Sequence, residues 1–313
     1  MGPEMNRRDF IKTGTAAALA SGLLPLDAAF GDAPAEAVSP ASLVWEAEGA
    51  PADTVPALFS SLGDLGEMMP DGLEGSTVLL KPNLCLPHPP AMATTTSPDL
   101  IDAICRYLTG KKVKRVIVAD HTLQKSGDFE SVEAVKVADK YPGVKMVLAN
   151  EQRYFEPVEV PGKVLKQTEV LKLISKADLV INVATAKHHS ATRVSLAAKN
   201  LMGVIWDRAE LHTRMDLHQA IADLAIAVRP GLNIVDAGKV LLDNGPTGPG
   251  PVKDDGRLFA AYDIVALDSV VVSRYNFGGK TQSAGDIAHL VAAHEAGAGE
   301  IDLKKIRVEK LKV

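Results

Sequence analysis

Residues 76–83 read STVLLKPN, an aliphatic run that stops abruptly at Lys81, Pro82 and Asn83. A short, nearly continuous run of Val, Leu and Ile is typical of a parallel strand that is buried on both faces. Working outward from this strand, comparable runs predict further strands at 42–47, 113–119, 144–148, 179–183, 232–236 and 306–311.

Amphipathic stretches separate these runs and predict helices at 52–68, 99–108, 131–140, 168–175, 216–227, 263–275 and 284–296. The clearest helix start is Ser97-Pro98-Asp99, where the serine can cap the first turn and the proline fits its first position. Because strands and helices alternate, we expect an α/β fold with right-handed crossovers: a doubly wound, mostly parallel sheet with helices on both faces. One domain over residues 42–313 accounts for all of these elements.

The composition excludes several classes of protein. The 313 residues are 46 % hydrophobic and 23 % charged, with a formal net charge of −5. These values exclude a disordered acidic tail and argue against a nucleic-acid-binding protein, which normally carries a basic stripe. The two cysteines, Cys85 and Cys105, are too few for a disulfide scaffold or for a four-thiolate cluster within one chain.

The N-terminal stretch NRRDFIKTGTAAALASGLL (residues 6–24) resembles a twin-arginine (Tat) export signal, with Arg7, Arg8 and Lys12 at consensus positions. Its apolar run of about 12 residues is too short to span a bilayer. Small residues at 33, 35 and 37 offer cleavage sites. The alternative is an amphipathic cytoplasmic helix that carries two arginines by chance. We expect residues 1–37 to be a signal peptide and linker, read by the Tat translocase. The mature chain would then be periplasmic or otherwise extracytoplasmic, with no membrane insertion.

Polar side chains follow four of the predicted strands. Ligands of doubly wound sheets bind where the carboxyl ends of the strands meet. Lysine and asparagine at that edge could hold a carboxylate or a phosphate, and histidine could act as an acid, a base or a metal ligand. The alternative is a set of structural turns. The candidates for ligand binding are Lys81, Asn83, Asn200 and Asp236, and those for catalysis are His121, Lys187, His188 and Lys199.

A mixed metal site is a further possibility. His188, His212 and His218 could act as ligands, together with Asp120 or Asp236, for zinc or iron. His212 and His218 are six residues apart, which is not the spacing of a helical metal-binding pair, so only the tertiary fold could bring them together.

Several spaced motifs resemble the DUF362 family, and they cover about residues 42–313. They are VLLKPN (78–83), the segment 94–98, ADLVINV (177–183) with Lys187 and His188 after it, KNLMG (199–203), DNGPTG (243–248) and ALD (266–268). The resemblance implies little about the reaction. Some family members carry ferredoxin-like cysteine runs and are associated with iron–sulfur proteins. This chain has no such run, so that association does not carry over.

Two functional hypotheses follow. The first is an exported DUF362-like enzyme that binds a small anionic ligand at the strand-end cluster, with an unknown reaction and a divalent metal as one possible cofactor. The second is a non-catalytic periplasmic protein that binds or carries a metal or cofactor in the same pocket. An iron–sulfur carrier would need two chains to share Cys85 and Cys105, and we do not expect it.

Overall fold

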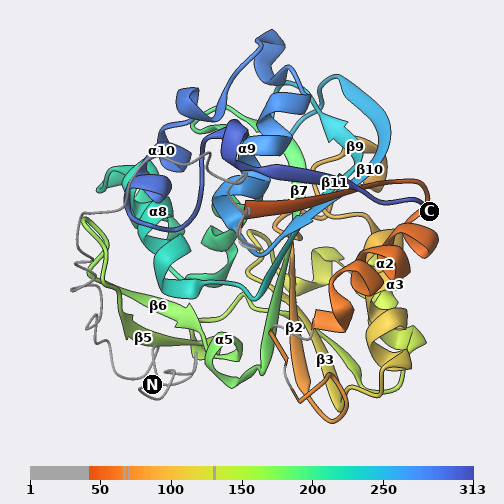
Figure 1. Ribbon diagram of the computed structural model, residues 1–313. Coiled ribbons are helices and arrows are strands. Elements are labelled where there is room, and N and C mark those ends of the chain that lie inside the picture. Colours follow the sequence, from red (N-terminus) through yellow and green to blue (C-terminus); the bar gives the residue numbers. More distant parts are fainter. Residues whose placement is uncertain (1–41, 66–67, 70, 130–131) are drawn as a thin grey trace, which may run out of the picture.

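The computed structural model describes residues 42–65, 68–69, 71–129 and 132–313. The predicted export signal lies outside these residues. The described part of the chain forms a central nine-stranded sheet with helices around it, and a separate two-stranded sheet packs beside it (Figure 1).

The central sheet has the order β11-β1-β10-β9-β7-β2-β3-β4, and β8 pairs with β7. Strands β8 and β10 run antiparallel to their neighbours, and the other strands are parallel to one another. The small sheet pairs β5 with β6. The strands are β1 Leu43–Glu48, β2 Thr77–Pro82, β3 Arg115–Asp120, β4 Val144–Leu148, β5 Phe155–Glu159, β6 Gln167–Leu171, β7 Leu179–His189, β8 Arg193–Ser195, β9 Leu232–Leu241, β10 Val252–Ala261 and β11 Arg307–Lys310.

The helices are α2 Pro51–Ser61, α3 Pro98–Gly110, α4 Glu133–Lys136, α5 Leu173–Lys176, α6 Ala197–Asn200, α7 Arg208–Thr213, α8 Leu217–Val228, α9 Ile264–Arg274 and α10 Ala288–Glu295. Ser97 caps α3 as the sequence predicts, because its side chain accepts a hydrogen bond from the Leu100 amide. Among the described residues, none of the helices combines the length and the apolar character that a membrane crossing requires.

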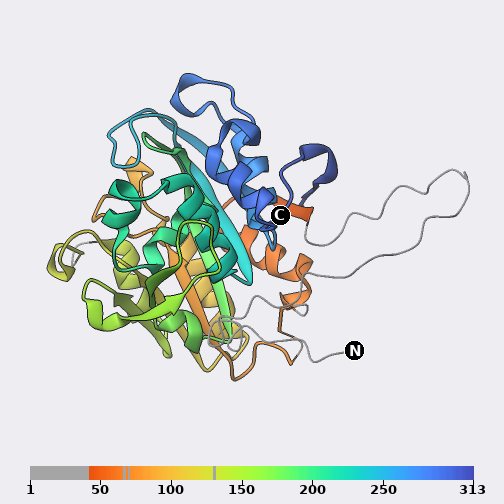
Figure 2. The same cartoon turned by 90° about the vertical axis from the view of Figure 1, so that its left-hand side faces the viewer.

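Two hydrophobic cores lie on opposite faces of the sheet. Val78 and Leu80 of β2 point into one core, and Leu79 points into the other, as the alternation of a strand requires. Helices α2 and α3 cover the first face, whereas α6, α8, α9 and α10 cover the second. The turned view in Figure 2 shows helices on either side of the strands. The predicted α/β fold with a mostly parallel sheet is therefore confirmed.

The order of the strands reverses between β2 and β7. The chain builds β2, β3 and β4 outward in one direction, then returns to place β7 and β9 on the other side of β2. In α/β sheets of this kind, a crevice opens at the carboxyl ends of the strands on either side of such a reversal. The topology therefore indicates the carboxyl ends of β2 and β7 as the place for a ligand site.

The strands differ from the sequence prediction in several places. Residues 168–175 do not form one helix, because β6 occupies Gln167–Leu171 and only Leu173–Lys176 is helical. Strand β10 was not predicted, since its first half, VKDDGR, is charged and lies exposed or partly exposed. Strands β7 and β9 also extend several residues beyond their predicted ends, which places Lys187 inside a strand.

Candidate functional site

A buried ion pair joins the ends of β2 and β3. Lys81 Nζ lies 2.6 Å from Asp120 Oδ1 and also donates to the Pro82 carbonyl. Asp120 accepts two backbone hydrogen bonds in addition, from Leu84 N at 2.6 Å and His121 N at 3.0 Å. Burial lowers the pKa of Lys81, and the Asp120 carboxylate opposes that shift.

Gly203 packs directly against this ion pair. A Cβ atom at Gly203 would stand 2.6 Å from Lys81 Nζ and would also collide with the Asp120 carboxylate. The Gly203 carbonyl accepts the His121 amide at 3.1 Å. The glycine of the KNLMG motif is therefore required by close packing against the ion pair.

A chain of asparagines ties four elements together at this edge. Asn200 Oδ1 accepts from Asn83 Nδ2 at 3.1 Å and from Lys81 Nζ at 3.3 Å. Asn200 Nδ2 donates to Asn182 Oδ1 at 2.8 Å, and Asn182 Nδ2 donates to Asn233 Oδ1 at 3.0 Å. The sequence prediction missed Asn182 and Asn233, although an asparagine inside the apolar run LVINV was a usable signal.

Lys187 enters the same region from β7. Its Nζ donates to the Thr94 carbonyl at 2.5 Å and to Asn83 Oδ1 at 3.3 Å, so both of its partners are neutral. The side chain is buried, and this burial lowers the pKa of the ammonium group. A positive charge held only by neutral acceptors is energetically costly.

Lys199 is the least satisfied of the three lysines. The residue is 8 % exposed, and within the described part of the chain no hydrogen bond or ion pair of its ammonium group is found. The pKa of Lys199 is lowered to about 8, mainly by burial; Cys85 opposes this shift, and the positive charges of Lys187 and Arg208 add to it.

Arg208, at the start of α7, completes this group. It donates to the carbonyls of His121 at 3.1 Å and Thr122 at 3.3 Å. Burial lowers its pKa, while Asp120 and Cys85 raise it. We call Lys81, Lys187, Lys199 and Arg208 the cationic cluster. Asp120 is the carboxylate paired with it, so positive charge is in excess.

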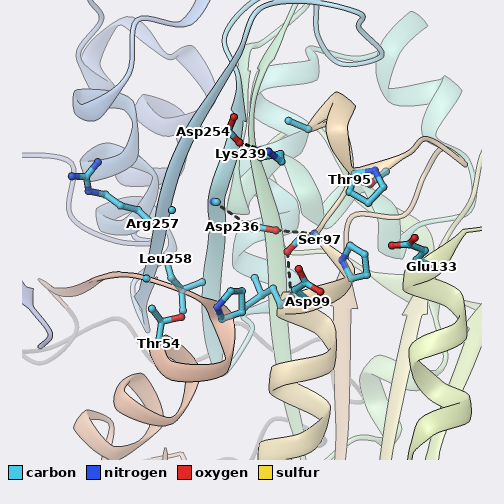
Figure 3. A pocket seen from close by; sticks show the side chains of 18 residues that line it. Thr54, Thr95, Ser97, Asp99, Glu133, Asp236, Lys239, Asp254, Arg257 and Leu258 are labelled. Atoms are coloured by element: carbon cyan, nitrogen blue, oxygen red, sulfur yellow. Dashed lines mark hydrogen bonds and ion pairs between the residues drawn. The ribbon is translucent and has the colours of Figure 1, made fainter. Parts of the chain in front are cut away.

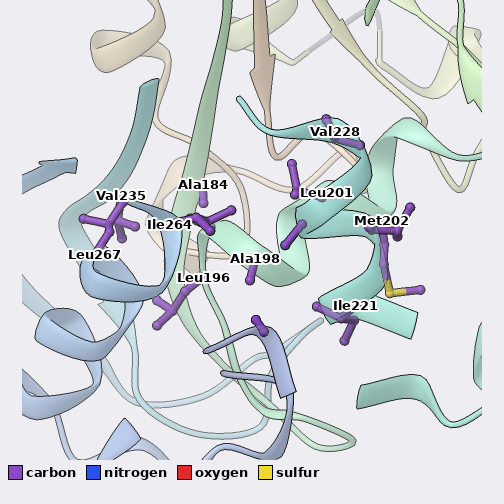
Figure 4. Packing of buried hydrophobic residues seen from close by; sticks show 14 of the residues in the cluster. Ala184, Leu196, Ala198, Leu201, Met202, Ile221, Val228, Val235, Ile264 and Leu267 are labelled. Carbon is purple, nitrogen blue, oxygen red and sulfur yellow. The ribbon is translucent and has the colours of Figure 1, made fainter. Parts of the chain in front are cut away.

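Helix α6, which carries Lys199 and Asn200, is held rigidly. The buried carboxylate of Asp268 in α9 accepts from Ala197 N at 2.8 Å and from Ala198 N at 2.9 Å. Apolar side chains of the neighbouring elements, including Ala184 of β7 and Ile264 of α9, pack around α6 (Figure 4). Burial raises the pKa of Asp268 to about 7. Asp268 therefore positions Lys199 indirectly, by holding the first amides of α6.

The histidines are arranged differently from the prediction. His121 stacks on Trp206 at 5.2 Å between ring centroids, and its Nδ1 lies 2.7 Å from the Ile205 carbonyl. Burial and the charge of Arg208 lower its pKa to about 4, so the ring is neutral near pH 7. His188 accepts from Gly245 N at 3.1 Å and so faces the loop after β9. His189, in contrast, lies near Lys199. The pKa of His189 is lowered to about 3, mainly by burial and next by the positive charge of Lys199.

The three predicted metal ligands do not come together. His188 faces the Gly245 loop. The ring of His212 stacks on that of His189, with 6.5 Å between ring centroids, and the ring of His218 stacks on that of the buried His289, with 5.9 Å between centroids. The described residues contain no group of three or more His, Cys, Asp or Glu side chains that could hold a metal ion. The ligand set inferred from the sequence is therefore not assembled, because it required distant loops to converge.

Asp236 belongs to a different place at the sheet edge. Its carboxylate accepts from Ser97 N at 2.8 Å and Gly238 N at 3.0 Å, and burial raises its pKa. It lines a pocket of about 260 Å³ together with Thr95, Ser97 and Lys239 (Figure 3). The segment 93–97 lies between this pocket and the cationic cluster, because the Thr94 carbonyl accepts from Lys187. Asp236 thus stands apart from the other candidates.

Both cysteines are free thiols. Cys105 is buried in α3, and this burial raises its pKa to about 12. Cys85 is partly buried beside the cationic cluster, with Sγ 3.4 Å from Asn83 Oδ1.

The chain is similar to a curated protein and to a solved structure. The chain is 25 % identical over 227 residues to the "Thylakoid-associated protein sll1697" of Synechocystis sp. (strain ATCC 27184 / PCC 6803 / Kazusa), a match that spans 68 % of this chain and 66 % of that protein. Among solved structures, lactate racemase apoprotein from Thermoanaerobacterium thermosaccharolyticum aligns with a TM-score of 0.45 at 13 % identity, over 78 % of this chain and 60 % of that one. Neither alignment reaches two thirds of the relative's own length.

The family model described as "Domain of unknown function (DUF362)" matches residues 78–273, which contain Lys81, Lys187, Lys199, Arg208 and Asp268. The chain belongs to the DUF362 family.

Proposed function

We propose that the cationic cluster binds a small anion, a carboxylate or a phosphate, and that this anion is the substrate of an enzyme. The observation that carries the proposal is Lys199: the residue is 8 % exposed, no hydrogen-bond partner of its ammonium group is found in the described residues, and the charges of Lys187 and Arg208 help to lower its pKa. Burial and neighbouring positive charges disfavour the charged form of a lysine, and a nearby opposite charge favours it. An anion next to Lys199 would therefore stabilise its ammonium group.

The surroundings favour an anion in other ways. The cluster lies at the carboxyl ends of β2 and β7, where the strand order reverses, the usual place for ligands of α/β sheets. The low polarity of the surroundings strengthens attraction between opposite charges compared with water. The hydrogen bonds of Lys81 and Lys187 hold them in place, so little reorganisation is needed on binding.

Replacement of Lys199 tests the proposal. Lys199→Met should weaken the binding of inorganic phosphate or acetate at pH 7 at least tenfold (about 1.4 kcal/mol). Lys199→Arg should bind within a few-fold of the native chain, since it keeps the charge. Isothermal titration calorimetry on the full chain measures both, with the exposed Lys305→Met as the matched control. Native binding that Lys199→Met leaves unchanged would rule the site out, as would absence of binding.

The affinity should also depend on pH. Because the pKa of Lys199 is about 8, the group is charged below that pH and neutral above it. Anion affinity should therefore fall as pH rises through 8, and the same titrations carried out at higher pH would reveal the loss.

We further propose that the protein is exported by the twin-arginine route to the periplasm or an equivalent compartment, on the strength of residues 6–24. Arg7→Lys with Arg8→Lys should keep the protein in the cytoplasm when cell fractions are compared by immunoblot. The control, Arg153→Lys with Arg307→Lys, changes two exposed arginines of the folded part and should export normally. Normal export of the first variant would contradict the proposal.

A further inference from the structure

We propose that the pocket beside Asp236 is a second binding site, and that it takes a small organic cation, a primary amine on a short hydrocarbon stem. The pocket has a volume of about 260 Å³ and is lined by β9, β10 and the first turns of α2 and α3 (Figure 3). Typical ligand pockets measure roughly 300–1,000 Å³, so this one suits a ligand at the small end of that range.

Apolar side chains form much of the pocket wall. Leu258 of β10 and Leu100 of α3 are buried beneath it. Prolines line the pocket at the starts of both helices and before α3, at positions 51, 90 and 98. Since these rings carry no N–H donor, they offer contact to hydrocarbon and no hydrogen bond. The wall therefore fits the stem of a ligand, and its polar end must be met elsewhere.

Asp236 supplies a buried carboxylate to the same space. The residue is 6 % exposed, and its oxygens accept one backbone hydrogen bond each, Oδ2 from Ser97 N and Oδ1 from Gly238 N. An ionised carboxylate can accept about four hydrogen bonds, so acceptor sites remain for a ligand. Burial raises the pKa of Asp236, the bonds from Ser97 and Gly238 oppose that shift, and Asp99 adds to it. A cation in the pocket would stabilise the carboxylate.

Both cationic side chains of the lining already have partners. Lys239 Nζ forms an ion pair with Asp254, which also lines the pocket. Arg257 pairs with three carboxylates that do not line the pocket, those of Glu46, Glu48 and Asp255. Neither cation is therefore left to receive an anionic ligand.

Three carboxylates of the lining have no such counter-charge. Within the described residues, no ion pair of Asp99, Glu133 or Asp236 is found. Asp99 and Glu133 are exposed and stand at the opening, whereas Asp236 is buried. Negative charge in and around a cleft attracts a cation and repels an anion. An ammonium group, with its three N–H donors, fits the free acceptor sites of Asp236.

The pocket is separate from the cationic cluster. Thr95 and Ser97 line the pocket, whereas the carbonyl of Thr94 between them accepts from Lys187 on the other side of the segment. An amine in the pocket and an anion at the cationic cluster would thus occupy different spaces. Inorganic phosphate should not compete with the amine, and the two sites can fail independently.

Calorimetry on the full chain at pH 7 tests the site with n-butylammonium chloride, and n-butanol serves as the neutral analogue. We expect butylammonium to bind at least about tenfold more tightly than butanol, because butanol lacks the charge that Asp236 meets. Addition of inorganic phosphate should leave this binding unchanged. Equal binding of the two compounds, absence of butylammonium binding, or competition by phosphate would overturn the inference.

Asp236→Asn should weaken butylammonium binding at least about tenfold. Glu74→Gln, the matched control, removes an exposed carboxylate outside the pocket and should bind as the native chain does. Should Asp236→Asn fail to fold, Asp99→Asn with Glu133→Gln takes its place and should weaken binding about threefold or more, the scale of exposed charge interactions. Unchanged affinity in the folded Asp236→Asn protein, or in the double variant used instead, would overturn the inference.

Discussion

Asp120→Ala should lower the free energy of unfolding by about 3–5 kcal/mol, because it leaves the buried Lys81 ammonium group without its counter-charge. The side chains of the pair are 1 % and 2 % exposed, so water cannot replace the lost partner. The substitution also removes the acceptor of two backbone amides, those of Leu84 and His121. Urea unfolding of the two proteins gives the difference.

Lys81→Met is the matched variant, because it removes the other half of the pair. Asp120 then keeps both backbone donors, so its charge stays partly satisfied. We expect Lys81→Met to lose at least about 1 kcal/mol less than Asp120→Ala. An equal or larger loss for Lys81→Met would show that the backbone amides do not stabilise the Asp120 carboxylate as described.

Asp268→Ala should cost about 2–5 kcal/mol, since it leaves the Ala197 and Ala198 amides unpaired in the core. Because these amides begin α6, the variant should also misplace Lys199 and lose anion affinity. Asp268→Asn keeps one acceptor and should lose less. Urea unfolding measures the stability, and calorimetry with phosphate measures the affinity. Unchanged phosphate affinity in a folded Asp268→Ala protein would contradict the positioning role.

The raised pKa of Asp268 adds a pH dependence with a definite sign. The folded protein holds the Asp268 proton up to about pH 7, whereas the unfolded chain releases it near the ordinary value of 3.8. The contribution of this group is therefore full below pH 3.8 and is lost as pH rises through 7. Asp268→Asn should flatten the stability profile between these values, and an unchanged slope would assign the pH dependence to other groups.

Much of the fold could be predicted because local patterns carry it. The aliphatic runs of β2, β3, β4 and β7 need no partner to be recognised, since burial on both faces selects Val, Leu and Ile. Strand β10 was not predicted because its first half exposes charged residues instead of an aliphatic run. Its extended conformation is stabilised by pairing with β1 and β9.

The grouping of Lys81, Asn83 and Lys187 could be predicted, because the strand ends bring these residues to one edge of the sheet. Arg208 was missed because its partner, the carbonyl of His121, lies 87 residues away in the sequence. His188 was a candidate from the sequence, and His189 was not. Side chains of a strand alternate between its two faces, so His189 lies on the same face of β7 as Lys187, whereas His188 faces the Gly245 loop.

The most direct test of the anion site is a crystal structure of the full chain soaked in bromide, with anomalous data collected at the bromine edge. We expect a bromide ion in contact with Lys199 Nζ, between Lys187 and Arg208, and no bromide at this place in Lys199→Met. Bromide ions bound only at the protein surface, with the cationic cluster unoccupied, would show that this cluster does not bind anions.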